Sequence, residues 1–198
     1  MNLYIYPYIF CIIIVIFVVS IYLVSYANNI VFDSTYSLKF DNIQYSTYEL
    51  TGKYLWPVIG YNNITSYYGR RKAPTAGAST FHRGIDIGAP TGSNLVSIMD
   101  GIVIMSKFNG ANGFSIIVQN GNMQAIYAHV HDKYLPALNT KVKKGQVIGK
   151  VGPKNVYNVP NNPYKDSNGN PTNGTTTGAH LHFSIKINGE YVNPLEYI

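Results

Sequence analysis

Short strand-like runs separated by turn dipeptides are the feature that most restricts the fold of this chain. From Trp56 onward, β-branched and aromatic residues occur in runs of only a few residues. Asn-Gly, the dipeptide most typical of a two-residue β-hairpin, separates such runs three times. The three pairs are Asn109-Gly110, Asn120-Gly121 and Asn188-Gly189. No segment after residue 54 has the period and length of a long helix. The sequence therefore predicts an all-β domain built on a compact antiparallel sheet.

Three segments show this pattern best, and one segment breaks it. "FSIIVQNGNMQAIYAHV" and "LHFSIKINGEYV" are each predicted to form two strands around an Asn-Gly turn, and "KKGQVIGKVG" a short strand bounded by glycines. The segment from Pro153 to Thr177 is rich in Asn, Pro, Gly and Thr, which predicts a long surface loop. Loops of this length are uncommon unless they are functional or disordered, so we expect it to border a binding groove.

The N-terminal segment differs from the rest of the chain. Leu3 to Val24 is almost unbroken apolar or aromatic sequence, and as a helix it would rise about 33 Å, enough to cross a hydrocarbon core of ~30 Å. Ser25-Tyr26-Ala27 has the small-x-small pattern of a signal-peptidase site. Residues 1–27 are thus predicted to be a membrane anchor or a signal peptide, and we favour an uncleaved anchor. Residues 28–54 are predicted to be a spacer, and residues 55–198 an exported domain, which would be secreted if the chain were cleaved after Ala27.

Charge and cysteine content narrow the choice of partner and metal ligand. The chain has fifteen Lys and Arg against nine Asp and Glu, which favours an anionic surface such as a cell-wall polymer or a nucleic acid. The basic residues are scattered, so we do not predict nucleic-acid binding. The single cysteine, Cys11, lies in the apolar run, which excludes a disulfide framework and a thiolate metal site. Any metal must be held by histidine and carboxylate ligands.

Two short segments carry candidate metal ligands. In "GAHLHF", His180 and His182 would share one face of a strand about 7 Å apart, which suits a metal site or an acid/base pair, and equally a solvent-facing strand edge. In "FHRGIDIGAPTG", His82 and Asp86 are four residues apart, and the glycines and proline argue against a helix. A catalytic zinc takes three protein ligands and leaves one position open. One C-terminal histidine would complete such a set, whereas the alternative is a local His82–Asp86 hydrogen bond at a turn.

A third segment, "IYAHVHDK", carries two further histidines. His129 and His131 are predicted to share a face at the end of a strand. One of them could orient a water molecule or stabilise a developing oxyanion. Two solvent-exposed histidines at a strand end are the alternative.

Taken together, these segments resemble the lysostaphin-type (LytM-like) zinc metalloendopeptidases, which cut peptides in bacterial peptidoglycan. That family carries an H-x-x-x-D segment, a Y-x-H segment and a C-terminal H-x-H segment. The corresponding residues are His82 to Asp86, Tyr127-Ala128-His129 and His180-Leu181-His182. "SYYGRRKAPTAGASTFHRGIDIGAPTG" and "VKKGQVIGKVG" also match, so the resemblance runs from about Trp56 to Tyr197.

The resemblance implies a function and a role for each site residue. It implies a zinc-dependent endopeptidase with one zinc per chain, held by His82, Asp86 and His182, and with peptidoglycan peptides as substrate. It also implies that His180 and His129 face the substrate in acid/base and transition-state roles. Spacing alone does not distinguish His180 from His182.

Some positions depart from the family pattern. Ala179 stands where proline is usual, Ser184 where an acidic residue is usual, and His131 where a small polar residue is common. Neither Ala179 nor Ser184 corresponds to a ligand or a catalyst. The Pro153 to Thr177 loop is much longer than the usual turn, so substrate preference does not carry over.

Two other interpretations compete with an active enzyme. One is a catalytically inactive relative that keeps the fold and binds peptidoglycan or regulates another enzyme; such proteins normally lack a ligand, and this chain lacks none. The other is a biotinyl or lipoyl carrier domain, suggested by "KVKKGQVIGKVG". A carrier needs a second half around a modifiable lysine, and the sequence contains no such half.

Overall fold

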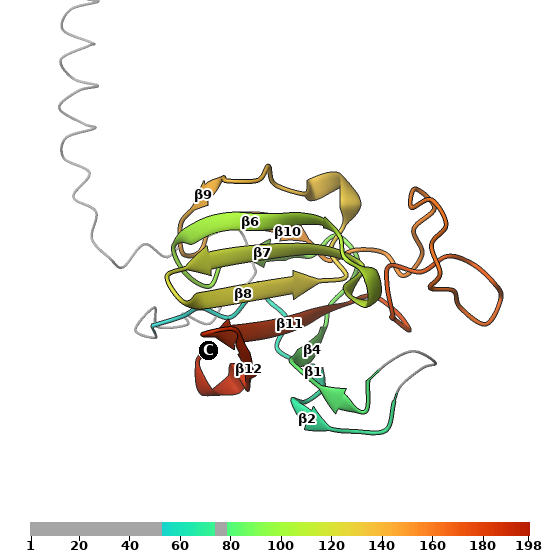
Figure 1. Ribbon diagram of the computed structural model, residues 1–198, viewed down its shortest axis with the longest axis horizontal. Helices are drawn as coiled ribbons and strands as arrows, with labels where there is room; N and C mark the ends of the chain where they lie inside the picture. The colour runs from blue at the N-terminus through green and yellow to red at the C-terminus, as the bar shows by residue number, and fades with distance from the viewer. Residues whose placement is uncertain (1–52, 74–78) are drawn as a thin grey trace, which may run out of the picture. The chain divides into compact units, whose positions relative to one another are not determined.

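An eight-stranded antiparallel sheet forms the body of the domain, as the sequence predicts (Figure 1). The computed structural model describes residues 53–73 and 79–198. Along the sheet the strand order is β1-β4-β11-β8-β7-β6-β9, and β12 pairs with β11. The strands are β1 (Ile64–Ser66), β4 (Ile85–Gly88), β11 (His180–Ile187), β8 (Met123–Ala128), β7 (Phe114–Asn120), β6 (Gly101–Phe108), β9 (Lys141–Val142) and β12 (Glu190–Val192).

Small elements complete the described part of the chain. Two further pairs of short strands are antiparallel: β5 (Asn94–Val96) with β10 (Val147–Lys150), and β2 (Gly69–Arg70) with β3 (Phe81–His82). Within the described residues, the only helical elements are three 3-10 turns. These are η1 (Gly110–Asn112), η2 (Asp132–Tyr134) and η3 (Pro194–Glu196).

Successive side chains of strand β11 point alternately into the core and to the opposite face of the sheet. Leu181, Phe183 and Ile185 are fully buried and belong to the hydrophobic core. His180 and His182 alternate with them and therefore point to the opposite face. The alternation predicted from "GAHLHF" is confirmed here, because Leu181, Phe183 and Ile185 all contribute to the core.

Two of the three predicted hairpins have tight two-residue turns. Asn188 and Gly189 connect β11 to β12 with φ values of 53° and 86°, the positive values that a two-residue type I′ turn requires. In the β7–β8 hairpin, however, Asn120 pairs with Met123, so the turn residues are Gly121 and Asn122. The hairpin was predicted correctly, with its turn displaced by one residue.

The third Asn-Gly pair does not form a two-residue turn. Strands β6 and β7 pair as a hairpin, but residues 109–113 connect them and contain η1. Asn109 has φ −133°, so this pair does not have the two positive φ values that a type I′ turn needs. The longer connection matters for the site described below, because Ala111 and Gly113 contact the loop that precedes β11.

Two predictions concern segments outside the sheet. The predicted long loop is confirmed, since no strand lies between the end of β10 at Lys150 and the start of β11 at His180; this loop (orange in Figure 1) projects from the end of the sheet. The predicted anchor or signal peptide and most of the predicted spacer lie outside the described residues. Within 53–73 and 79–198, no helix is long and apolar enough to span a membrane.

Candidate metal centre and neighbouring histidines

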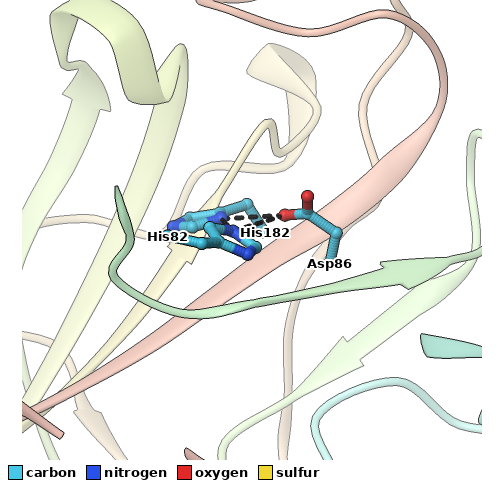
Figure 2. A group of neighbouring side chains, drawn as sticks. All are labelled: His82, Asp86 and His182. Atoms are coloured by element: carbon cyan, nitrogen blue, oxygen red, sulfur yellow. Dashed lines mark hydrogen bonds and ion pairs between the residues drawn. The ribbon is translucent and has the colours of Figure 1, made fainter. Parts of the chain in front are cut away.

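Three segments distant in sequence bring His82, Asp86 and His182 together. His82 ends β3, and the chain turns at Arg83 and Gly84 before Asp86 in β4. Asp86 and His182 lie directly opposite each other in the antiparallel pairing of β4 with β11. Side chains of directly opposed residues share a face and lie close together. The strand register therefore places Asp86 and His182 on the same face of the sheet, and the turn after β3 brings the His82 side chain to them (Figure 2).

One ligand-type atom from each of these residues points toward the other two. His82 Nε2 lies 3.1 Å from Asp86 Oδ1 and 2.8 Å from His182 Nδ1, and His182 Nδ1 lies 2.9 Å from Asp86 Oδ1. His82 is buried, and the other two side chains are largely buried. Among the described residues, these form the only group of three or more His, Cys, Asp or Glu side chains arranged as a metal centre.

The other polar atom of each side chain is held by a partner outside the cluster. His82 Nδ1 donates to the carbonyl of Tyr67 at 2.9 Å, Asp86 Oδ2 accepts from Arg71 Nη1 at 3.0 Å, and His182 Nε2 lies 2.9 Å from Ser184 Oγ. Such partners orient metal ligands and determine which ring nitrogen is free to bind. They leave His82 Nε2, Asp86 Oδ1 and His182 Nδ1 as the donor set.

Arg71 and Ser184 are partners that the sequence did not identify. Ser184 is noted in the sequence only as a departure from the family pattern, whereas in the structure its hydroxyl contacts His182. Its place two residues after His182 on a strand, and therefore on the same face, was an available signal. Arg71 reaches Asp86 from the segment that follows β2, and nothing in its local sequence points to that contact.

The electrostatics of the cluster suit a bound cation. Burial by itself would raise the pKa of Asp86, but the close contacts of its carboxylate with the His182 and His82 rings outweigh it and hold the pKa well below its usual range. Burial lowers the pKa of His182. The carboxyl group is therefore ionised and the imidazole neutral, which are the protonation states that metal coordination requires.

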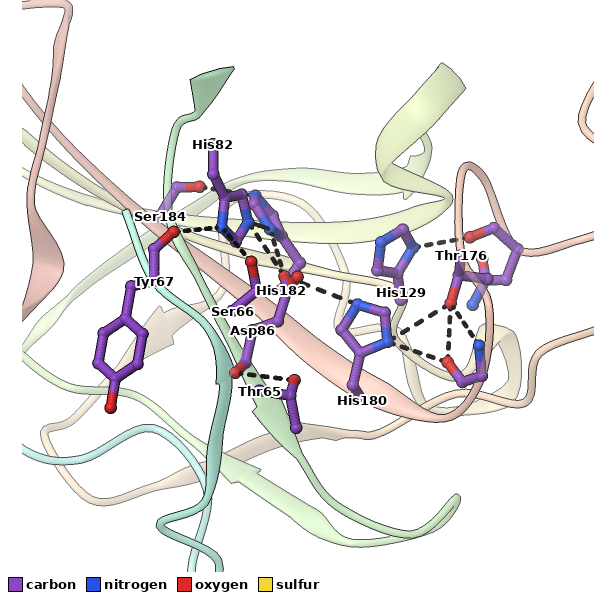
Figure 3. A network of polar contacts seen from close by, with 12 residues as sticks. Thr65, Ser66, Tyr67, His82, Asp86, His129, Thr176, His180, His182 and Ser184 are labelled. Carbon is purple, nitrogen blue, oxygen red and sulfur yellow. Dashed lines mark hydrogen bonds and ion pairs between the residues drawn. The ribbon is translucent and has the colours of Figure 1, made fainter. Parts of the chain in front are cut away.

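His180 and His129 form a second pair beside the cluster (Figure 3). Their ring centroids are 4.8 Å apart, and His180 Nε2 lies 3.7 Å from Asp86 Oδ1. His180 Nδ1 donates to the Gly178 carbonyl at 2.9 Å, and His129 Nδ1 donates to the Asn173 carbonyl at 2.7 Å. A carbonyl only accepts, so both rings carry a proton on Nδ1, and the neutral form of each ring has its lone pair on Nε2.

His129 is neutral at ordinary pH. Burial lowers its pKa to about 3, with further lowering from the neighbouring His180 and His182. It lies just beyond the end of β8 and has φ 57°, a left-handed conformation that is uncommon for a residue with a side chain. This turn in the backbone directs the ring toward His180 instead of along the strand.

The predicted shared face of His129 and His131 is wrong. The left-handed backbone at His129 ends the strand alternation, and His131 caps η2. Its ring contacts Asp132 at 2.8 Å and lies 5.1 Å from the Tyr134 ring. Tyr127 also lies away from the cluster: it is fully buried in the core, where its hydroxyl accepts a hydrogen bond from the Ile98 amide. The Y-x-H segment therefore contributes only His129 to the site.

Gly84 allows the β3–β4 turn to approach β11. A Cβ atom at this position would lie 2.3 Å from the Phe183 carbonyl oxygen and 2.5 Å from Ser184 Oγ. We expect Gly84→Ala to lower the free energy of unfolding by about 1–3 kcal/mol, because the turn must move away from β11. Denaturant unfolding measures the change. Gly178→Ala is the control, since a Cβ there meets nothing within 4 Å, and equal stability of the two variants would contradict the prediction.

Residues 80–194, more than half of the chain, match the family model described as Peptidase family M23. The chain belongs to this family. The match includes all five residues of the two clusters, and it confirms the family resemblance seen in the sequence.

Relatives of this chain have the names of peptidases, among them a DD-carboxypeptidase/endopeptidase and a peptidoglycan DD-endopeptidase. The chain is 29% identical over 136 residues to the DD-carboxypeptidase/endopeptidase Mpg of Neisseria meningitidis, covering 68% of this chain and 27% of the relative. It is 27% identical over 168 residues to the peptidoglycan DD-endopeptidase ShyC of Vibrio cholerae, covering 81% and 34%. This M23 chain thus spans about a third or less of the length of these relatives.

Solved structures share the fold. A zinc-containing peptidase from Vibrio cholerae is 29% identical, with a TM-score of 0.54 over 70% of this chain and 37% of that one. The catalytic domain of lysostaphin from Staphylococcus simulans has a TM-score of 0.52 at 20% identity, over 69% of this chain and 91% of that one. At this identity the likeness shows only that the two chains share a fold.

Proposed function

We propose that this M23 chain is a zinc-dependent endopeptidase that hydrolyses peptide bonds in bacterial peptidoglycan. The observation that carries the proposal is the convergence of His82 Nε2, Asp86 Oδ1 and His182 Nδ1, with a second pair of imidazoles beside them. The relatives named as DD-endopeptidases, and the zinc-containing structural neighbour, support both the substrate class and the metal.

The donor set fits zinc. Two imidazole nitrogens and one carboxylate oxygen match the three protein ligands of a catalytic zinc site, and each is oriented by an outer partner. A zinc ion held by His82, Asp86 and His182 would supply Lewis-acid activation of a water molecule and of the scissile carbonyl group.

His180 is the group best placed to move a proton. Its Nδ1 proton is committed to the Gly178 carbonyl, and its Nε2 lone pair faces the cluster. Nε2 can therefore accept a proton from the attacking water and return it to the leaving amine nitrogen. Because its ring remains neutral with a lone pair on Nε2, His129 can orient the same water by accepting a hydrogen bond.

The alternative is a catalytically inactive relative that binds peptidoglycan or regulates another enzyme. The presence of the three-residue cluster and of the His129–His180 pair beside it favours an active enzyme. Zinc content and cleavage of purified peptidoglycan separate the two. We expect about one zinc per chain and release of soluble muropeptides. Zinc without cleavage would support the inactive relative, and failure to bind zinc would refute the proposed metal centre.

We also propose that the peptidase domain acts outside the cytoplasm, attached to the membrane by an uncleaved N-terminal helix. The apolar run from Leu3 to Val24 supports this location. Protease added to intact spheroplasts is expected to digest the domain, while a cytoplasmic marker protein remains intact. Protection of the domain until the membrane is permeabilised would place it in the cytoplasm, away from the wall.

A further inference from the structure

Asn173, in the long loop before β11, is fully buried and uses its side-chain and backbone polar groups together. Its Oδ1 accepts a hydrogen bond from the Phe114 amide at 2.7 Å, and its Nδ2 donates to the Val130 carbonyl at 3.0 Å. Its backbone amide donates to the Lys154 carbonyl at 2.8 Å, and its carbonyl accepts from His129 Nδ1. A buried amide side chain with both ends paired is held in a single orientation.

Two of these partners, Phe114 and Val130, lie at the strand ends next to His129. Phe114 begins β7, and Val130 directly follows His129 after β8. The Asn173 side chain therefore ties the loop to the two strand ends between which His129 emerges. The same hydrogen bonds bring the Asn173 carbonyl to 2.7 Å from the imidazole.

Two glycines permit this close approach of loop and strand ends. A Cβ atom at Gly113 would lie 2.2 Å from the Asn173 carbonyl oxygen, and one at Gly174 would lie 2.3 Å from the Ala111 carbonyl oxygen. Both residues also have positive φ, 63° and 74°, which glycine adopts without strain. The Thr175 amide adds a hydrogen bond to the Ala111 carbonyl at 2.7 Å. The close packing of the loop against the strand ends thus depends on glycine at both positions.

From these contacts we infer that Asn173 is a positioning residue for His129: its side chain anchors the carbonyl that holds the imidazole proton on Nδ1 and leaves the lone pair on Nε2. Asn173 acts only through His129 and contacts no reacting atom. The expected effect on kcat rests on the proposed function, whereas the expected position of the His129 proton does not.

The test compares Asn173→Ala with the unchanged full-length protein. The protonated nitrogen of His129 is read from the ¹⁵N chemical shifts of its ring, and zinc content, kcat and KM are measured on the same samples. We expect His129 to carry its proton on Nδ1 in the unchanged protein and to lose this preference in Asn173→Ala. We expect kcat to fall about 10- to 100-fold, the usual effect of removing an outer hydrogen-bond partner, with KM and zinc content unchanged.

Asn158→Ala is the matched control. Asn158 lies in the same loop, and its Nδ2 donates to Asp132 Oδ2 at 2.6 Å, an exposed hydrogen bond away from His129. This variant loses a side-chain amide of the same kind, so its His129 shifts and kcat should equal those of the unchanged protein. An equal loss of kcat in both variants would attribute the effect to general disturbance of the loop and overturn the inference.

Two further outcomes would decide the question even if Asn173→Ala folded poorly. His129 protonated on Nε2 in the unchanged protein would overturn the inference directly. In Asn173→Asp, the carboxylate keeps an acceptor for the Phe114 amide but loses the donor to Val130, so the Nδ1 preference should weaken; full retention of it would count against the inference. A protein that keeps the Nδ1 proton in an Asn173-dependent way but cleaves no peptidoglycan would refute only the proposed function.

Discussion

His182→Ala is expected to abolish zinc binding and activity together, whereas His180→Ala keeps its zinc and loses only activity. His182 Nδ1 is one of three converging donor atoms, so its removal leaves two protein ligands and lowers zinc affinity steeply. His180 lies outside that set, with Nε2 at 3.7 Å from Asp86 Oδ1. Its removal should reduce turnover by about 10²- to 10⁴-fold, the usual contribution of a positioned acid/base group.

Zinc stoichiometry measured alongside turnover checks both variants. His131→Ala is the control, because His131 contacts Asp132 and Tyr134 in η2 and none of the clustered residues; it should be nearly silent in both measurements. His129→Ala should resemble His180→Ala. If His180→Ala lost its zinc while His182→Ala retained it, the two assignments would be reversed.

Removal of the metal is expected to have the other largest effect. Chelation should abolish peptidoglycan cleavage, and addition of zinc should restore it, because His82, Asp86 and His182 provide a complete three-ligand set. Zinc should also raise the Tm, since a ligand that binds only the folded state stabilises it. The chelated and the zinc-restored protein are compared in a muropeptide-release assay and in thermal unfolding.

His182→Ala is the control for the stability measurement, because zinc should raise its Tm much less than that of the unchanged protein. Full activity in a thoroughly metal-free protein would rule out the metal-dependent mechanism. An equal rise in Tm in both proteins would mean that zinc binds elsewhere on the chain.

The local sequence determined the fold class and much of the strand pattern. Asn188-Gly189 specifies a tight hairpin because both residues tolerate positive φ, and it forms one. Asn109-Gly110 carries the same signal yet is part of a longer connection, in which Gly113 packs against Asn173. Local turn preference was overridden there by a contact with a residue 60 positions away.

For the candidate site too, the local sequence predicts some features and the tertiary structure decides others. The period of a strand predicts that His180 and His182 share one face, and the family motifs in the sequence include His82, Asp86, His129, His180 and His182. The direct pairing of Asp86 with His182 depends on how β4 and β11 align, over a separation of 96 residues. No local pattern in either strand specifies that register.

What only the tertiary structure decided is which atom of each residue is available. The sequence does not say which ring nitrogen of a histidine carries the proton. In the folded chain, the hydrogen-bond partner of one nitrogen determines which nitrogen keeps its lone pair. This partner is the Tyr67 carbonyl for His82, the Ser184 hydroxyl for His182 and the Asn173 carbonyl for His129. The sequence determined that these histidines and Asp86 could form a site, because residue type and strand period are local properties. Their orientation was decided by hydrogen bonds between distant segments, which form only when the chain is folded.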